Sequence, residues 1–191
     1  MAFYRKPNRL RADVYLGRHA YFLTLCTDAR RRFFTDAALV NQLVSVLRQT
    51  SACHGFGVYA YCFMPDHLHL VLTTEINSAE LSRFVQAFKS LSAREGWKHR
   101  LKRLWQKGFY DHVLRDGESL EAAAWYVFEN PVRAGLGRCG EDWPYSGSFV
   151  FSWPGFRAPV KPFVPSWKSA PRNGKKPDGE TSSPLRTELR R

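Results

Sequence analysis

The sequence has few acidic residues, no long apolar run and no paired cysteines. Its 191 residues contain 17 Asp and Glu against 29 Lys and Arg, a formal net charge of +12. No apolar segment approaches the ~20 residues that span a bilayer, so we do not expect a membrane protein. The first residues form no apolar segment of the kind found in secretory leaders. These absences predict a soluble protein of the cytoplasm.

The four cysteines are scattered along the chain and form no Cys-x-x-Cys pair. They are Cys26, Cys53, Cys62 and Cys139. Disulfide frameworks are typical of small secreted domains, whereas isolated cysteines in a chain without a leader are typical of reducing compartments. We therefore expect free thiols, in agreement with a cytoplasmic location.

The excess of basic residues favours a polyanionic partner, and nucleic acid before all others. Residues 155–191 hold nine Lys or Arg and three Asp or Glu, which is half of the net charge of +12. The other half belongs to residues 1–154, so the part expected to fold is basic as well. Hydrophobic residues make up 44% and aromatic residues 15% of the chain, enough for a substantial core.

The apolar pattern divides the chain into three parts. Residues 1–19 form a basic arm without clear periodicity, and residues 20–154 carry the periodic segments of one domain. Residues 155–191 are rich in proline, serine and basic residues, so we expect a disordered tail.

Strands and helices alternate within the predicted domain. We expect strands at 21–26, 57–63, 67–73 and 109–115. Apolar residues at helical spacing predict helices around 39–47, 81–91 and 120–127. The resulting order, β-α-β-β-α-β-α, predicts an α+β fold: a ferredoxin-like antiparallel sheet with helices packed on one face.

Residues 61–72 are the most informative segment. They are predicted to form two strands joined by a tight turn at 64–66. Because strand side chains alternate between faces, His67 and His69 point the same way, with Cα atoms roughly 6.5–7 Å apart. Two imidazoles on one face can bind one metal ion, whereas a single strand histidine is more often a half-buried polar residue. The short spacing alone leaves both interpretations open.

The last predicted helix carries a second pair of polar side chains. Tyr126 and Asn130 are four residues apart, so they share one face of a helix. They lie at the edge of its apolar arc, where a side chain can face a cleft between helix and sheet. A helical tyrosine is more often a packing residue, and periodicity does not distinguish Tyr126 from the other tyrosines.

Three segments, taken in order, resemble the HUH-superfamily single-tyrosine transposases, and among these the REP-associated tyrosine transposases. The segments are 63–72, 104–116 and 125–136. HUH denotes two histidines separated by a hydrophobic residue, which here are His67 and His69 around a leucine. The segment 142–148 also resembles the stretch that ends the family's domain. The resemblance covers roughly residues 10–150.

This resemblance implies roles for four residues. His67 and His69 would ligate a divalent metal ion, Mg²⁺ or Mn²⁺. Tyr126 would be the nucleophile, and Asn130 would lie where a third, amide ligand is found. Insertion-sequence relatives carry Gln there, whereas Asn130 is one methylene shorter and precedes Pro131, which disfavours helical geometry at Asn130.

The resemblance also implies a reaction. The enzyme would nick and rejoin single-stranded DNA with hairpins or palindromic repeats through a covalent 5′-phosphotyrosine, leaving a free 3′-OH. Two alternatives remain. One is a related protein that binds structured single strands without cutting them, and the other is a hydrolase in which water attacks and Tyr126 only packs. A homodimer is a further expectation, with Tyr126 acting in its own chain or in the partner.

Basic side chains outside this site are candidate contacts for the DNA backbone. Taken singly, each is also typical of a solvated surface. They lie in the arm and along the second helix and the loop after it: Arg5, Arg9, Arg11, Lys89, Lys98, Arg100, Lys102 and Arg103. Three aromatic residues are candidates for stacking on unpaired bases: Tyr15, Trp97 and Trp105.

Overall fold

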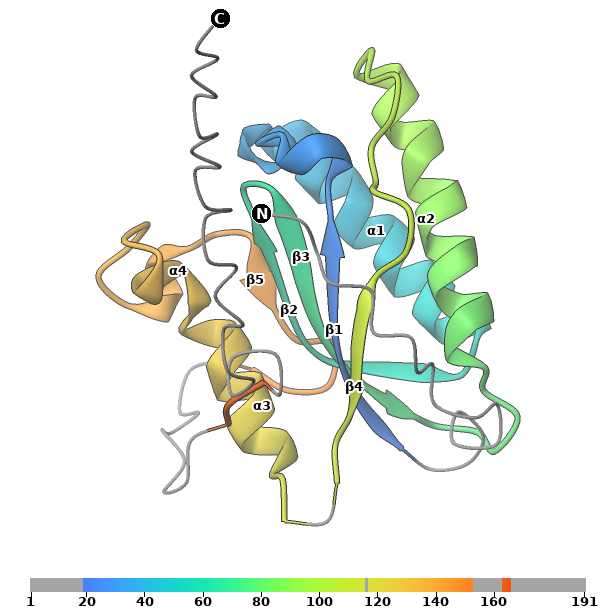
Figure 1. Ribbon diagram of the computed structural model, residues 1–191, viewed down its shortest axis with the longest axis vertical. Coiled ribbons are helices and arrows are strands. Elements are labelled where there is room, and N and C mark those ends of the chain that lie inside the picture. The colour runs from blue at the N-terminus through green and yellow to red at the C-terminus, as the bar shows by residue number, and fades with distance from the viewer. Residues whose placement is uncertain (1–18, 116, 153–162, 166–191) are drawn as a thin grey trace, which may run out of the picture.

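A five-stranded antiparallel sheet organises the molecule (Figure 1). The computed structural model describes residues 19–115, 117–152 and 163–165. The strands are β1 (Ala20–Cys26), β2 (Phe56–Met64), β3 (His67–Thr74), β4 (Tyr110–Val113) and β5 (Ser146–Gly147). They lie in the order β4-β1-β3-β2-β5, and each neighbouring pair is antiparallel. The central strand β3 therefore has a strand on both sides along its whole length.

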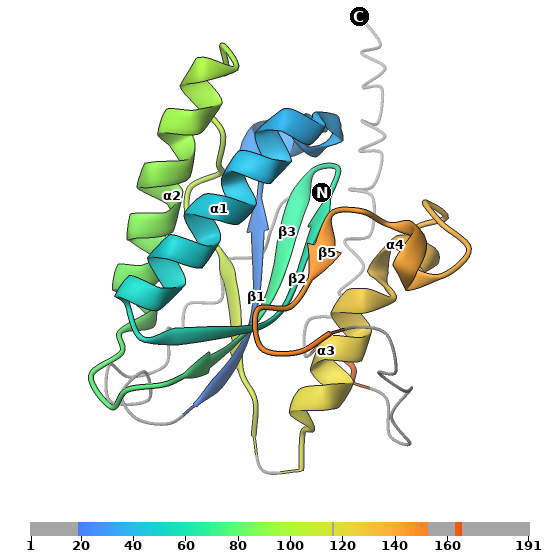
Figure 2. The same ribbon diagram turned by 180° about the vertical axis from the view of Figure 1, so that it is seen from behind.

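Helices cover both faces of the sheet (Figures 1 and 2). They are α1 (Ala37–Cys53), α2 (Leu81–Lys98), α3 (Leu120–Phe128) and the short α4 (Asn130–Arg133). Three 3₁₀ turns lie at Asp28–Arg30, Phe33–Thr35 and Gly140–Asp142. The predicted α+β class and the order of the elements are confirmed. The expected placement of helices on one face holds for α1 and α2, whereas α3 packs on the opposite face.

The α1 and α2 helices bury a large apolar core against one face of the sheet. Alternate residues of β3, such as Leu68 and Leu70, point into it and are fully buried. The α1 helix begins at Asp36, whose carboxylate accepts hydrogen bonds from the backbone N–H groups of Ala38 and Leu39. Such an N-cap satisfies donors that the first helical turn leaves unpaired. Leu39 is itself part of this core.

The α3 helix approaches the other face through small side chains. Ala122, Ala123 and Ala124 are buried there against Phe22 and Val71 of the sheet. Alanine side chains are small, so the axis of α3 can lie close to the strands. Larger side chains at the edge of this contact then remain near the sheet. This is the face onto which His67 and His69 project.

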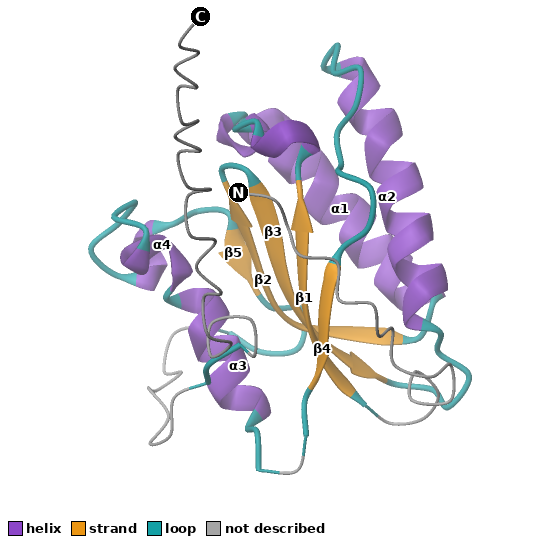
Figure 3. Ribbon diagram, viewed as in Figure 1, coloured by secondary structure: helices purple, strands orange, loops and turns teal. Residues whose placement is uncertain are grey.

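The termini are described only in part (Figure 3). The described residues include only His19 from the predicted arm at 1–19. From the predicted tail they include only 163–165. Phe163, which we expected in a disordered tail, is buried and packs against Phe22 and Tyr126. Within the described ranges, no helix is long and apolar enough to cross a membrane.

Candidate metal and tyrosine site

The histidine pair of β3 converges on one point. The Nε2 atoms of His67 and His69 are 3.0 Å apart, and the two ring planes are nearly perpendicular, at 83°. His69 is only 3% exposed, whereas His67 lies nearer the surface. The two-residue period of the strand puts both rings on the α3 face, as the sequence predicts.

The other ring nitrogen of each histidine already has a partner. Thr24 Oγ1, on β1, lies 2.9 Å from Nδ1 of His69, and Asp66 Oδ1 lies 2.6 Å from Nδ1 of His67. A carboxylate accepts hydrogen bonds, so Nδ1 of His67 is the protonated nitrogen. Asp66 and Thr24 engage the two Nδ1 atoms, and the converging Nε2 atoms are the candidate metal ligands.

The separation of the Nε2 atoms fits two adjacent ligands of one divalent ion. Ligands at right angles on an octahedral ion with bonds of ~2.1 Å lie about 3.0 Å apart. Burial of the ring is the main reason that the pKa of His69 lies well below its ordinary value, and the neighbouring His67 is the second reason. The ring therefore stays neutral, as a metal ligand must. Among the described residues no group of three or more His, Cys, Asp or Glu is arranged to hold a metal ion.

Asp66 connects the histidine pair to the arginine-rich loop after β1. Its Oδ2 lies 3.2 Å from Nη1 of Arg30, while Oδ1 accepts from His67. Burial raises the pKa of the Asp66 carboxyl, but the hydrogen bond from His67 and the charges of His67 and Arg30 outweigh burial and lower the pKa overall. The carboxylate stays ionised and fixes the orientation of the His67 ring.

Helix α3 brings Tyr126 to the same side of the sheet. The ring centroid of Tyr126 lies 6.3 Å from that of His69 and 5.6 Å from that of Phe22. The side chain is 7% exposed. The helix begins at Ser119, whose hydroxyl accepts from the backbone N–H of Ala122. The fold thus places a phenol beside the histidine pair within a single chain.

Asn130 lies after α3, at the start of α4. Helix α3 ends at Phe128, and Pro131 has no N–H to continue the helical ladder. The Asn130 side chain is buried, and its Nδ2 donates to the carbonyl of Tyr126 at 2.9 Å. The amide oxygen, the atom that would bind a metal ion, is not used in this bond. The structure thus brings His67, His69 and Tyr126 together, whereas the Asn130 side chain contacts the backbone of Tyr126.

Comparison with known proteins shows the family of the chain. Residues 16–130 match the family model described as "Transposase IS200 like". The chain belongs to this family. The prediction of a transposase enzyme is thereby confirmed.

Two relatives of this transposase are assigned to the REP-associated tyrosine transposases, which confirms the resemblance. The protein of Haemophilus influenzae is 28% identical over 147 residues, covering 71% of this chain and 82% of the relative. The protein of Escherichia coli K12 is 27% identical over 109 residues, covering 52% of this chain and 64% of the relative. A solved REP-associated tyrosine transposase bound to a REP hairpin shares the fold, with a TM-score of 0.61 and 22% identity over 76% of this chain and 82% of that one.

The sequence analysis did not single out Arg133, which contacts Tyr126. Its guanidinium carbon lies 4.2 Å from the centroid of the Tyr126 ring, and its Nη2 donates to the Tyr126 carbonyl. The spacing of seven residues, two helical turns, was the available signal. The break between α3 and α4 lies between them, so spacing alone could not place one side chain over the other.

Lys89, a candidate DNA contact, is held inside the protein. Its Nζ donates to the carbonyls of Gln106 and Gly108, at 2.6 Å each. Burial lowers the pKa of Lys89 to about 8. These bonds attach the loop before β4 to α2. The candidates of the arm, Arg5, Arg9 and Arg11, lie outside the described residues.

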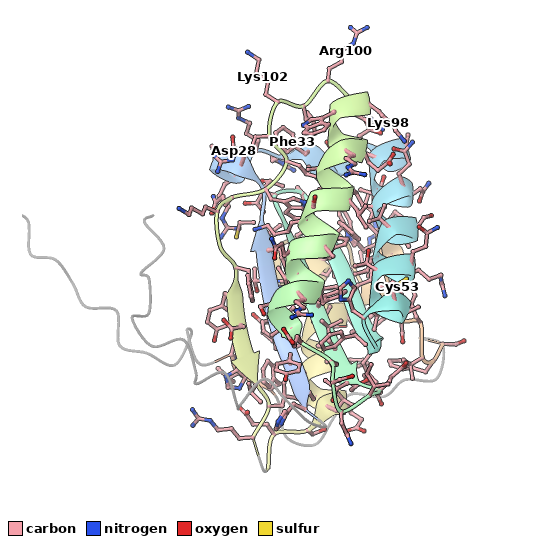
Figure 4. All side chains as sticks on the ribbon, turned by 90° about the vertical axis from the view of Figure 1, so that its right-hand side faces the viewer. Asp28, Phe33, Cys53, Lys98, Arg100 and Lys102 are labelled. Atoms are coloured by element: carbon pink, nitrogen blue, oxygen red, sulfur yellow. The ribbon has the colours of Figure 1, made fainter. Side chains whose placement is uncertain are left out.

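The other candidate DNA contacts surround the end of α2 (Figure 4). Lys98 pairs with Glu95 at 2.8 Å, and Arg103 lies 3.7 Å from Asp28. Arg100 and Lys102 are exposed and form no ion pair with any residue that the structure describes. Figure 4 shows Lys98, Arg100 and Lys102 at the same end of the α1/α2 side.

An open hollow of about 330 Å³ lies between α2 and the loop that follows it. Trp97 lines the hollow and is 62% exposed, whereas Trp105 lines it as a buried residue whose Nε1 donates to Ser92. Lys102 and Arg103 also line it. An exposed indole beside cations is suited to an unpaired base and its phosphate.

Proposed function

We propose that this transposase nicks and rejoins single-stranded DNA by attack of Tyr126 on a phosphodiester held at the histidine pair. One observation carries the proposal: the Tyr126 ring lies beside His69 on the face where His67 and His69 converge. A nucleophile and a cation site on one face are the two parts that phosphoryl transfer to tyrosine requires.

His67 and His69 would hold Mg²⁺ or Mn²⁺, with the amide oxygen of Asn130 as a third ligand. When bound, the ion would supply positive charge to the scissile phosphate and to the charge that develops on it. Imidazoles and an amide are neutral, so these ligands leave that charge uncompensated. Thr24 and Asp66 keep the two rings oriented through their Nδ1 atoms.

The covalent step exchanges one phosphodiester for another. The Tyr126 oxygen attacks phosphorus in line, so an Oη–P bond forms while the P–O3′ bond of the DNA breaks. The phenol proton passes to solvent, and the departing 3′ oxygen takes up a proton to become a free 3′-OH. The downstream strand stays linked to Tyr126 through its 5′-phosphate, and the reverse reaction with a 3′-OH rejoins DNA.

The proposed partner is single-stranded DNA that contains hairpins or palindromic repeats. The net charge of +12 and the exposed cations near the end of α2 support a polyanionic partner. The solved relative bound to a REP hairpin supports the hairpin. The proposed backbone contacts are Arg5, Arg9, Arg11, Lys89, Lys98, Arg100, Lys102 and Arg103, with Lys89 acting through the loop that it attaches.

A homodimer in the cytoplasm remains part of the proposal. Mixing His67→Ala chains with Tyr126→Phe chains tests whether the tyrosine of one protomer works with the histidines of its partner. Regained activity in the mixture indicates action in trans. The proximity of Tyr126 to His69 in one chain supports action in cis, in which case the mixture stays inactive.

Covalent trapping tests the reaction. The protein is incubated with Mn²⁺ and hairpin-flanked single-stranded DNA labelled at either end, and the products are separated under denaturing conditions. We expect 3′-labelled DNA to yield a labelled protein band and 5′-labelled DNA to yield a free fragment. The band should vanish in Tyr126→Phe and persist in the matched control Tyr59→Phe. Cleavage without an adduct would indicate a hydrolase, and binding without cleavage a DNA-binding module.

A further inference from the structure

We propose that Arg133 is the positioning residue for the Tyr126 nucleophile, clamping both its ring and its backbone across the break between α3 and α4. The inference rests on the proposed role of Tyr126. No part of the reaction described above requires Arg133, and its place in the site comes from the contacts that the fold creates.

The first part of the clamp acts on the backbone of Tyr126. In an uninterrupted helix this carbonyl would accept the N–H of residue 130. Here it accepts two side-chain donors, Nδ2 of Asn130 and Nη2 of Arg133. Helix α3 ends only two residues later, so these donors connect the last turn of α3 to side chains of α4.

The second part of the clamp acts on the ring. The guanidinium carbon of Arg133 lies 4.2 Å from the Tyr126 centroid. Three rings of described residues meet the Tyr126 ring at steep angles, 77° for Phe22, 72° for His69 and 79° for Phe163. A planar guanidinium stacks on an aromatic face and is more weakly hydrated than an ammonium. Arg133 therefore restricts the ring torsions that direct the hydroxyl.

The position of the charge supports a role in the reaction. The guanidinium of Arg133 lies over the Tyr126 ring, and His69 is one of the other neighbours of that ring. The guanidinium thus provides a fixed cation beside the side chain that would receive the phosphoryl group. A lysine would retain the charge but could not stack a planar group on the ring while also binding the carbonyl.

A kinetic experiment separates positioning from DNA binding. Arg133→Lys and Arg133→Met are compared with Arg138→Met, which removes an exposed arginine five residues further on. We expect the single-turnover rate of adduct formation at saturating DNA to fall about 100-fold in both Arg133 variants, because small misplacements of a nucleophile are that costly. DNA affinity should stay within about threefold of the parent value. Unchanged rates with weakened DNA binding, or full activity in Arg133→Lys, would overturn the inference.

A second measurement needs neither DNA nor metal. Tyrosine-labelled protein (¹³C in the ring) is examined by NMR, and the Tyr126 signal is identified by its loss in Tyr126→Phe. The signal should move in Arg133→Lys and stay in place in Arg138→Met, while the other tyrosine signals show that the fold is intact. An unmoved signal overturns the clamp even if the protein cuts DNA. If the signal moves in Arg133→Lys while the parent protein forms no adduct, the proposed function is refuted, and with it the nucleophile that Arg133 would position.

Discussion

The two faces of the sheet bury different kinds of residue. The face under α1 and α2 is filled with large apolar side chains, among them Leu70, Phe84 and Phe88, all fully buried. The face under α3 has a smaller cluster that mixes small side chains such as Ala123 with large ones such as Phe22, and it also buries the polar His69. One face is therefore suited to stability and the other to chemistry.

Strand β3 contributes buried side chains to both faces of the sheet. Along β3, Leu68 and Leu70 point to the α1/α2 face, while His69 between them points to the α3 face. Burying an imidazole costs free energy unless it has a hydrogen-bond partner, and Thr24 supplies that partner for His69. The stability of the apolar face therefore offsets the cost of burying polar groups on the reactive face, and changes on one face at a time test this division.

The largest effect is expected on the reactive face. His69→Ala removes one of the two converging imidazoles, so Mn²⁺-dependent adduct formation should fall by about 1,000-fold. The trapping gel measures this. The matched change on the other face, Leu70→Ala, should retain most activity at temperatures where it is folded. Equal losses in the two folded variants would contradict the division of the sheet.

The next effect is expected on the apolar face. Leu70→Ala should lower the free energy of unfolding by about 2–5 kcal/mol, because it leaves a cavity in a close-packed core. His69→Ala should change it by less than about 1 kcal/mol, since it removes a polar group whose burial is costly. Urea denaturation of both variants measures the difference. A larger loss of stability in His69→Ala than in Leu70→Ala would show that the α3 face contributes more to the stability of the fold.

A smaller effect is expected at Thr24, which orients one ring of the histidine pair. Thr24→Val keeps the shape of the side chain but removes the hydroxyl that bonds Nδ1 of His69. Mn²⁺ affinity, measured by calorimetric titration without DNA, should fall about 10–100-fold. Thr73→Val, at the far end of β3, is the control and should bind Mn²⁺ like the parent protein. Unchanged affinity in Thr24→Val would mean that the rings do not bind metal as proposed.

The smallest effect is expected away from the site, at the end of α2. Lys102→Ala should weaken DNA binding a few-fold and reduce its salt dependence by about one counterion. The rate at saturating DNA should not change, because Lys102 lies away from the site that Tyr126 and His69 form. Arg83→Ala, which removes an arginine paired with Glu80 at the other end of α2, is the control. A lower rate at saturating DNA in Lys102→Ala would show that this end of α2 takes part in the reaction.

Much of the fold could be predicted from the sequence because its signals are local. The apolar spacing at Leu39, Val40, Leu43 and Leu47 predicts the buried face of α1, and these residues are buried in the core. The alternation of β3 places His67 and His69 on one face. The side of the sheet that α3 covers could not be predicted, since a helix pattern records an apolar stripe but not the surface that buries it.

Single residues could not be assigned in the same way. Lys89 has the charge of a DNA contact, but its amine binds two carbonyls of a loop that lies 17 and 19 residues away in sequence. Phe163 has the surroundings of a tail residue, yet it packs on the Tyr126 ring. In both cases the partner is distant in sequence, so no local pattern records the contact.

The sequence is sufficient for the order of the elements, the common face of the two histidines and the family to which the chain belongs, because strand alternation and motif spacing are properties of consecutive residues. Three contacts can be seen only in the folded chain: the Nε2 atoms meet 3.0 Å apart, Tyr126 lies beside His69, and Arg133 covers the Tyr126 ring. Those contacts depend on how α3 docks on the sheet and where that helix breaks. Docking is decided by packing between segments that lie far apart along the chain.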